Sequence, residues 1–461
     1  MQVSTPRIGR RLAALAILVA ITVPAVALAA APGDRTSEVR SAIEGGRAKN
    51  VILLIGDGMG DSEITIARNY TVGAGGRLAI DELPLTGQMT TYSVLESDPS
   101  TPDYTPESAS TATAWSTGHK TADGRISTTA GTDEDIPTIL ELAKAAGYAT
   151  GDVTTAELTD ATPAAPVAHV RARACQGPLN MASCPQDRKS VGGPGSIAQQ
   201  AVDLGVNVLL GGGKARFDQV IPAGEPNAGL TVLQTATAQG YTVVTDRGGL
   251  LAAEPGAELL GLFTAGNMSV DWTGPVAAHP PVGPVRCTED QRPANEPSLA
   301  EMTATAIELL DRSQSGQGKG QANGRPGFFL QVESASIDKR DHVSQACEQI
   351  GETVNFDEAV RVALDYAAEY PDTLVIVTGD HAHTSQIVEE DAAPAGFGIK
   401  LTTDEGGVMQ ISYGTGSSAT SQEHTGSQIR VAAQGPQAAN VVGLIDQTDL
   451  FRVMARALGV D

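Results

Sequence analysis

The stretch N-V-I-L-L-I-G-D-G-M-G-D-S-E, residues 50–63, decides the fold. Its apolar run, 51–55, is unbroken, which is typical of a strand buried on both faces of a parallel sheet. The run ends in Gly56-Asp57-Gly58, where glycines permit a sharp turn and leave the Asp57 carboxylate at the carboxyl end of the strand. Ligands of open α/β sheets bind beyond these ends, so Asp57 lies where chemistry is expected. The plainer interpretation is a turn aspartate that caps the helix starting near Glu63.

Downstream segments alternate between helical and strand-like patterns. Helices are expected at 108–117, 136–146, 196–204 and 230–239, and strands at 148–153, 206–210 and 241–245. This alternation predicts an α/β fold: a doubly wound, largely parallel central sheet with helices on both faces and the active site at the carboxyl ends of the strands. We expect one such domain over 30–461, with surface insertions near 271–297 (proline-rich, interpreted as loops) and 313–327 (polar and flexible).

The first 29 residues have the composition of an export signal. Three arginines, at 7, 10 and 11, precede an apolar run at 12–27, and Ala27-Leu28-Ala29 is a small-x-small cleavage site. No other run is long and apolar enough to span a bilayer. The sequence therefore predicts an exported protein, periplasmic or extracellular, whose mature chain begins near Ala30.

The net charge indicates which partners are excluded, and the number of cysteines indicates whether disulfides form. The net charge of −23 argues against nucleic acid as a partner. The four cysteines, Cys175, Cys184, Cys287 and Cys347, are an even number, which in an exported chain indicates two disulfides with three possible pairings. Nearness in sequence favours Cys175–Cys184, with Cys287–Cys347 as the second pair. A zinc site of four thiolates competes with this interpretation, but no C-x-x-C spacing supports it.

Titratable side chains follow two later apolar runs, 328–332 and 373–378, and a third set lies in a glycine- and serine-rich loop. They are Glu333, Asp338, Lys339, His342, Asp380, His381, His383 and His424. Carboxylates gathered at one sheet edge would repel each other unless cations lie among them. Mixed imidazole and carboxylate ligands suit zinc, and oxygen ligands suit magnesium. We interpret His383 as a partner of a ligand carboxylate, not as a ligand; for any single histidine a structural role is the alternative.

Ser108 is the candidate nucleophile. It begins the helix expected at 108–117, where free N–H groups favour an anion. No histidine base lies nearby in the sequence, so a metal would have to lower the hydroxyl pKa; an N-cap serine is the alternative. A phosphate would also need a cationic clamp, for which Arg173 is a candidate and Arg171 is nearly as good.

Six motifs in chain order resemble bacterial alkaline phosphatases of the periplasmic enterobacterial type. They are G-D-G-M-G-D-S-E at 56–63, E-S-A-S-T-A at 107–112, T-D-A-T-P at 159–163, V-E-S-A-S-I-D-K at 332–339, D-H-A-H at 380–383 and E-H-T-G at 423–426. The likeness runs from about Lys49 to the C-terminus. It implies a homodimeric hydrolase of diverse small-molecule phosphate monoesters, with two Zn²⁺ and one Mg²⁺ per active site. It also implies a metal-activated serine and a phosphoserine intermediate.

The resemblance also assigns roles by position. One zinc set is Asp338, His342 and His424, and the other is Asp57, Asp380 and His381. Asp57 would bridge to magnesium, whose other ligands are Glu333, Thr162 and, through waters, Asp160. The catalytic pair is Ser108 and Arg173; Arg173 and Lys339 bind phosphate; His383 and Glu107 support a ligand and the arginine. Both favoured cysteine pairs match the disulfides of the family.

Glu107 departs from the family pattern, because the nearest bacterial relatives usually have aspartate there. The longer side chain is expected to alter phosphate affinity or turnover without abolishing activity. The alternative functions are a phosphodiesterase of the same superfamily and a non-catalytic exported phosphate- or metal-binding protein. Diesterases generally lack the magnesium site and the arginine, so Glu333, Thr162 and Arg173 favour monoesters. A binding protein would hold phosphate tightly without turning it over.

Overall fold

The computed structural model describes residues 34–254, 256, 258–316 and 327–461, and the side chains only to 312 in the third of these ranges. The predicted export signal at 1–29 lies outside the described residues. So does most of the predicted polar loop at 313–327, whose first four residues belong to helix α10 (Leu299–Gly316). Among the described residues, no helix has the length and apolar content needed to cross a membrane.

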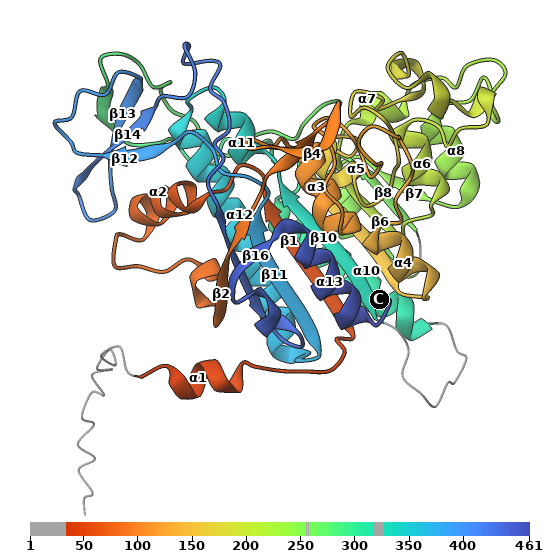
Figure 1. Cartoon of the computed structure of the whole chain (residues 1–461), viewed down its shortest axis with the longest axis horizontal. Helices are drawn as coiled ribbons and strands as arrows, with labels where there is room; N and C mark the ends of the chain where they lie inside the picture. Colours follow the sequence, from red (N-terminus) through yellow and green to blue (C-terminus); the bar gives the residue numbers. More distant parts are fainter. Residues whose placement is uncertain (1–33, 255, 257, 317–326) are drawn as a thin grey trace, which may run out of the picture.

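A ten-stranded sheet runs through the centre of the molecule (Figure 1). Its strands, in spatial order, are β16 (Gly443–Asp446), β2 (Leu85–Thr90), β15 (Ile429–Gln434), β11 (Thr373–Gly379), β1 (Asn50–Gly56), β10 (Phe328–Ser334), β5 (Ala149–Glu157), β6 (Val208–Gly212), β8 (Leu259–Leu262) and β7 (Thr242–Val244). Within this sheet only β15 runs antiparallel to its neighbours. The predicted doubly wound, largely parallel sheet is therefore confirmed.

Strand β1 lies between β10 and β11, which come from much later in the chain. The register places Gly56, the last residue of β1, opposite Ser334 of β10 and Gly379 of β11. The three parallel strands therefore end at the same level, and the residues that follow them meet at one edge.

Helices cover both faces of the sheet. Alternate side chains of β1 belong to two different cores: Val51, Leu53 and Ile55 pack in one, and Ile52 and Leu54 in the other. The first core includes α3 (Ser108–Thr117), α4 (Ile139–Ala145), α6 (Ile197–Asp203) and α13 (Gln447–Leu458). The second includes α10 and α12 (Ala346–Glu369). An apolar run with no polar alternation is what a strand covered on both faces requires.

Some helices and strands begin and end where the sequence predicts, and others differ by a few residues because of local contacts. The helix expected at 108–117 is α3. Helix α4 begins three residues later than expected, because Thr138 and Glu141 form a capping box that fixes its start. The strand expected at 148–153 continues as β5 to Glu157, which carries its polar end toward the site.

A four-stranded satellite sheet has the order β12 (Gln386–Val388), β14 (Val408–Tyr413), β13 (Phe397–Thr402), β9 (Val282–Val285). Strand β9 lies inside the segment 271–297, so the expectation of loops alone is wrong there. The strand was not predicted because it contains Pro284. Proline cannot donate to a ladder and is confined to sheet edges, which is where β9 lies. Trp272 and Ala277 of the same segment are buried.

The cysteines form the two favoured disulfides, Cys175–Cys184 and Cys287–Cys347. Besides five 3-10 turns, the described part of the chain has further α-helices and one small hairpin. They are α1 (Thr36–Ser41), α2 (Asp61–Thr71), α5 (Ala161–Ala164), α7 (Lys214–Phe217), α8 (Val232–Gln239), α9 (Arg247–Leu251), α11 (Ser336–Asp341) and the hairpin β3 (Ser93–Leu95)–β4 (Asp98–Asp103).

Candidate active site

The backbone at the ends of β1, β10 and β11 is tied together by hydrogen bonds. Asp57 N–H donates to the carbonyl of Ser334 at 3.0 Å, and Asp338 N–H donates to the carbonyl of Asp57 at 2.9 Å. Gly58 N–H donates to Oδ1 of Asp380 at 2.8 Å. Asp57 and Asp380 are thereby fixed side by side, as the sequence predicts from the common level of the strand ends.

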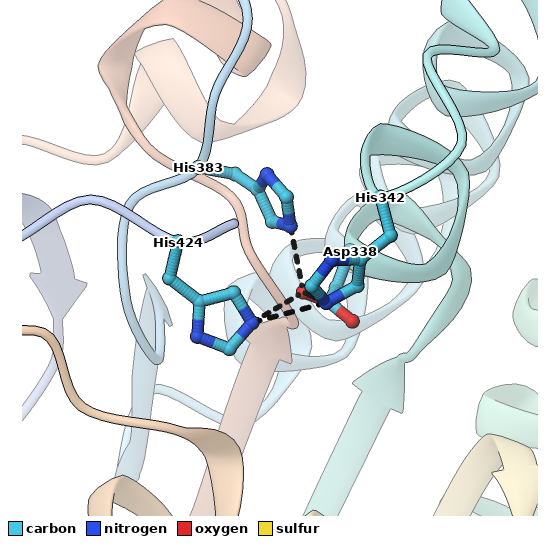
Figure 2. Close-up of side chains that lie close together, drawn as sticks. All are labelled: Asp338, His342, His383 and His424. Atoms are coloured by element: carbon cyan, nitrogen blue, oxygen red, sulfur yellow. Dashed lines mark hydrogen bonds and ion pairs between the residues drawn. The ribbon is translucent and has the colours of Figure 1, made fainter. Parts of the chain in front are cut away.

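Three histidines converge on one carboxylate oxygen, as Figure 2 shows. Oδ1 of Asp338 lies 3.3 Å from Nε2 of His342, 3.1 Å from Nε2 of His383 and 3.2 Å from Nε2 of His424. Asp338 lies on α11 with His342 at the end of the same helical turn, and the other two histidines come from loops. These four residues form a group that could hold a metal ion.

The hydrogen-bond partner of Nδ1 decides which ring nitrogen of each histidine carries the proton. Nδ1 of His342 faces the carbonyl of Gln422, and Nδ1 of His424 lies 2.9 Å from the carbonyl of Pro106. A carbonyl only accepts, so in the neutral ring both Nδ1 atoms carry the proton and both Nε2 atoms keep a lone pair.

His383 has the opposite arrangement. Its Nδ1 accepts the backbone N–H of Thr384 at 2.8 Å, so in the neutral ring the proton is on Nε2. Nε2 lies 3.1 Å from Oδ1 of Asp338, but the two atoms do not have the alignment of a hydrogen bond in the described structure. The proton positions therefore suit His342 and His424 as ligands. They suit His383 less well, because it presents an N–H and not a lone pair toward the carboxylate, although it lies in the same group.

Asp57, Asp380 and His381 form a second group that could hold a metal ion. Nε2 of His381 lies 3.2 Å from Oδ2 of Asp380 and 3.5 Å from Oδ1 of Asp57. Its Nδ1 lies 3.3 Å from the carbonyl of Ala382, which leaves the Nε2 lone pair facing the carboxylates. All three side chains are buried.

Ser108 lies beside this second group. Its Oγ is 3.4 Å from Oδ1 of Asp57 and 3.5 Å from Nε2 of His381. Ser108 begins α3, and Glu107, not Ser108, is the N-cap, accepting the N–H of Ser110 at 3.2 Å. The serine hydroxyl is thus not used for capping, which removes the plainer interpretation of Ser108.

A third set of oxygens lies next to these groups but outside both of them. Glu333 is buried and accepts a hydrogen bond from Thr154 Oγ1. Oγ1 of Thr162 is buried and makes no hydrogen bond within the described part of the chain. Burial raises the pKa of Glu333 to about 7. A buried hydroxyl without a partner near a buried carboxylate fits an oxygen-ligated cation such as Mg²⁺.

Arg173 and Lys339 both donate to Asp160. Nη2 of Arg173 lies 2.6 Å from Oδ1, and Nζ of Lys339 lies 2.9 Å from Oδ2. Arg173 also donates through Nη1 to Glu107. Burial works against the charge of Asp160, but the two cations hold the pKa of this carboxyl well below its ordinary value. Arg171 is exposed and its backbone bonds Asp187, so the structure brings Arg173, and not Arg171, to this cluster.

Two contacts at the site were not predicted. Thr154 lies on β5 one residue beyond the expected end of that strand. Thr111, on the first turn of α3, donates to Oδ2 of Asp380 at 3.3 Å. The motif at 107–112 contains Thr111, but its contact depends on how α3 docks against the end of β11.

The donor set fits bound cations. Burial, together with the charges of Asp380 and Asp338, raises the pKa of Asp57 well above its ordinary value. Carboxylates this close are not all ionised unless positive charge lies among them. The two groups offer the mixed nitrogen and oxygen ligands typical of zinc. The fold and this site define a metal-dependent α/β hydrolase.

Comparison with known proteins narrows this class to a family. The family model described as alkaline phosphatase matches residues 48–419 and 402–460. The chain is 52% identical over 447 residues to streptomycin-6-phosphate phosphatase of Streptomyces griseus, covering 96% of each. It is 52% identical over 442 residues to alkaline phosphatase of Escherichia coli K12, covering 93% of this chain and 90% of that protein. The chain therefore belongs to the alkaline phosphatase family and is a phosphate-monoester hydrolase.

Solved structures show the same fold. Alkaline phosphatase of Thermus thermophilus superposes with a TM-score of 0.65, at 22% identity, covering 94% of this chain and 96% of that one. Membership of the alkaline phosphatase family does not favour the phosphodiesterase alternative, and the non-catalytic alternative does not agree with that family.

Proposed function

We propose that this protein hydrolyses diverse phosphate monoesters by using Ser108 as a nucleophile and Arg173 as the phosphate clamp. The observation that carries the proposal is the position of the Ser108 hydroxyl, 3.4 Å from Asp57 and 3.5 Å from His381. It begins a buried helix whose N-terminal N–H groups favour an anion. The cluster of Arg173, Lys339 and Asp160 adds two cations for a phosphoryl group.

Three metal ions are part of the proposal: two Zn²⁺ and one Mg²⁺. One zinc set is Asp338, His342 and His424; the other is Asp57, Asp380 and His381; the magnesium set is Asp57, Glu333, Thr162 and, through waters, Asp160. The lone pairs on Nε2 and the unpartnered Thr162 hydroxyl support these sets. When bound, the ions would supply positive charge that favours a deprotonated serine and a negatively charged leaving oxygen.

The reaction proceeds in two steps at the Ser108 hydroxyl. Oγ of Ser108 loses its proton and forms a bond to phosphorus, while the bond from phosphorus to the ester oxygen breaks and the alcohol leaves with a proton. A phosphoserine results. A water then bonds to the phosphorus, the bond to Oγ breaks, and Oγ regains a proton as inorganic phosphate leaves. Arg173 would hold two phosphoryl oxygens through its planar guanidinium, and Lys339 would reach the phosphate through water.

Substrate breadth follows from where these contacts fall. Ser108, Arg173 and Lys339 all address the phosphoryl group and none needs a particular alcohol. We propose a broad set of small-molecule monoesters, and the name of one relative, streptomycin-6-phosphate phosphatase, supports including large polar alcohols in that set.

The proposal extends to assembly and location. It includes a homodimer, export by the segment at 1–29 to the periplasm or beyond, and a single domain over 30–461 with insertions near 271–297 and 313–327. The two disulfides support an oxidising compartment.

Initial rates on p-nitrophenyl phosphate and bis-p-nitrophenyl phosphate at alkaline pH, with zinc and magnesium supplied, test the proposal. We expect a strong preference for the monoester and a loss on the order of 10³-fold or more in kcat for Ser108→Ala. Ser116→Ala is the matched control, because Ser116 is a buried serine of the same helix whose hydroxyl has no described partner. Retained turnover in Ser108→Ala would remove the serine from the mechanism, and a preference for the diester would remove the proposed substrate class.

A further inference from the structure

The turn at Asp123-Gly124 contacts both members of the Glu107–Arg173 pair. Gly124 N–H donates to Oε1 of Glu107 at 2.5 Å, and the Gly124 carbonyl accepts the backbone N–H of Arg173 at 2.7 Å. Oε2 of Glu107 accepts from Nη1 of Arg173. These three contacts form a closed loop in which one glycine holds the main chain of the arginine and the side chain of its partner.

The backbone of Gly124 is in the left-handed region, with φ of +84°. A Cβ atom built at this position meets nothing within 4 Å. A larger residue would therefore be disfavoured by its own backbone conformation and not by a clash with neighbours. The glycine matters because its N–H and carbonyl are both engaged while it holds this conformation.

Asp123 secures the same turn against the start of α3. Its Oδ1 accepts Ser110 Oγ at 2.7 Å and the backbone N–H of Glu107 at 3.3 Å. The turn therefore holds the N-cap of the helix that begins with Ser108, and through Gly124 it holds Arg173.

We propose that the Asp123-Gly124 turn is a positioning element for Arg173: it fixes the Glu107 carboxylate and the arginine main chain relative to each other and so sets the direction of the guanidinium. The inference rests on the proposed role of Arg173 in binding phosphate. It also gives the longer side chain of Glu107 a function, since one carboxylate oxygen reaches the Gly124 N–H while the other reaches the arginine.

The test is inhibition of the zinc- and magnesium-loaded enzyme by inorganic phosphate. Gly124→Ala is expected to raise the inhibition constant for phosphate about 5-fold, because a displaced guanidinium loses part of a charge-assisted contact. Gly240→Ala is the matched control: Gly240 has φ of +109°, ends α8 and also has open space around a built Cβ. Both variants are expected to lower Tm, and only Gly124→Ala to change the inhibition constant. Equal inhibition constants in the two variants would overturn the inference.

A second comparison separates this inference from the proposed function. In an Arg173→Ala background, Gly124→Ala is expected to change the inhibition constant less than about 2-fold, since the contact it disturbs is already absent. An undiminished effect in that background would overturn the inference while leaving the role of Arg173 intact. If Arg173→Ala alone leaves phosphate inhibition unchanged, the proposed role of Arg173 fails and the inference fails with it.

Asp123→Ala keeps the test decisive if Gly124→Ala does not fold, because it leaves the backbone of the turn unchanged. It removes the acceptor for Ser110 and for the Glu107 N–H. We expect a rise of about 2- to 3-fold in the inhibition constant for phosphate, again absent in the Arg173→Ala background. A rise of the same size in both backgrounds would contradict the positioning role.

Discussion

Nε2 of His383 lies 3.1 Å from Oδ1 of Asp338 and carries the ring proton, because Nδ1 accepts the N–H of Thr384. A donor of this kind orients a ligand carboxylate, whereas a ligand would offer its lone pair. We expect His383→Ala to weaken zinc binding roughly 10- to 100-fold without changing the number of zinc ions bound at saturation. Zinc titration against a competing chelator, with metal analysis of the saturated protein, measures both.

His342→Ala is the comparison for this prediction. Because Nε2 of His342 keeps its lone pair, that variant is expected to lose one zinc per chain even at saturation. A full equivalent of zinc lost from His383→Ala as well would make His383 a ligand and contradict its role as a donor.

Thr162→Val tests the proposed magnesium set separately from the proposed zinc sets. The change keeps the volume of the side chain and removes a buried hydroxyl that has no described hydrogen-bond partner. We expect about 10-fold more magnesium to be needed for full activity while the zinc content is unchanged. Activity measured against magnesium concentration at saturating zinc reports this. Thr150→Val, which also removes an unpartnered buried hydroxyl on β5, should leave the magnesium curve unchanged.

Arg173→Ala and Arg171→Ala should differ strongly. Arg173 is paired with Glu107 and Asp160, whereas Arg171 is exposed. Loss of a charge-assisted contact costs about 1.5–3 kcal/mol, so phosphate inhibition should weaken on the order of 10- to 100-fold in Arg173→Ala. Arg171→Ala should stay within about 2-fold of the parent protein. Comparable weakening in both variants would refute the assignment of the clamp to Arg173.

The two disulfides should contribute unequally to stability. Cys287–Cys347 closes a separation of 60 residues and Cys175–Cys184 one of 9. In the chain-entropy model the longer loop stabilises by about 1.7 kcal/mol more. Guanidinium unfolding of the paired serine variants, Cys287→Ser/Cys347→Ser and Cys175→Ser/Cys184→Ser, measures the difference. Equal losses would show that unfolded-chain entropy does not control their contributions.

His169 and Glu141 give the folded state a pH dependence away from the metal sites. Their side chains are 3.0 Å apart; burial works against the charge on the imidazole, but the Glu141 carboxylate raises the pKa of His169 above 6.5. A raised histidine pKa stabilises the folded protein below about pH 6.5, and that stabilisation is lost as pH rises through the folded-state pKa. The free energy of unfolding of the parent protein should be larger than that of His169→Gln at pH 6. This difference should be on the order of 1 kcal/mol greater at pH 6 than at pH 8.5.

Denaturant unfolding of both proteins at the two pH values, with metals saturating, provides the measurement. The comparison cancels the pH dependence of the metal ligands, which the two proteins share. If the difference in free energy of unfolding between the two proteins is larger at pH 8.5 than at pH 6, the pKa of His169 is not raised in the folded state.

The strongest predictions from sequence concern residues placed by strand ends. Asp57 and Asp380 follow buried apolar runs, and parallel strands that end at one level bring such residues together regardless of their distance in the chain. The pairing of β9 was not predicted, because the short edge strand contains Pro284 and directly follows Pro280 and Pro281. The proton positions of His342, His383 and His424 also could not be read from sequence, since a backbone carbonyl or N–H in another loop decides each of them.

The order in which the chain supplies its site has a consequence for biosynthesis. The two metal-binding groups draw on residues as far apart as Asp57 and His424, and β1 lies between two strands made after residue 327. A growing chain emerges from its N-terminus, so β1 waits for both neighbours, and neither group of ligands is complete early in translation. A chain that ends before His424 lacks one member of the group at Asp338. His424 is supplied only after about 92% of the residues have been made, so the proposed zinc set at Asp338 cannot form until translation is nearly complete.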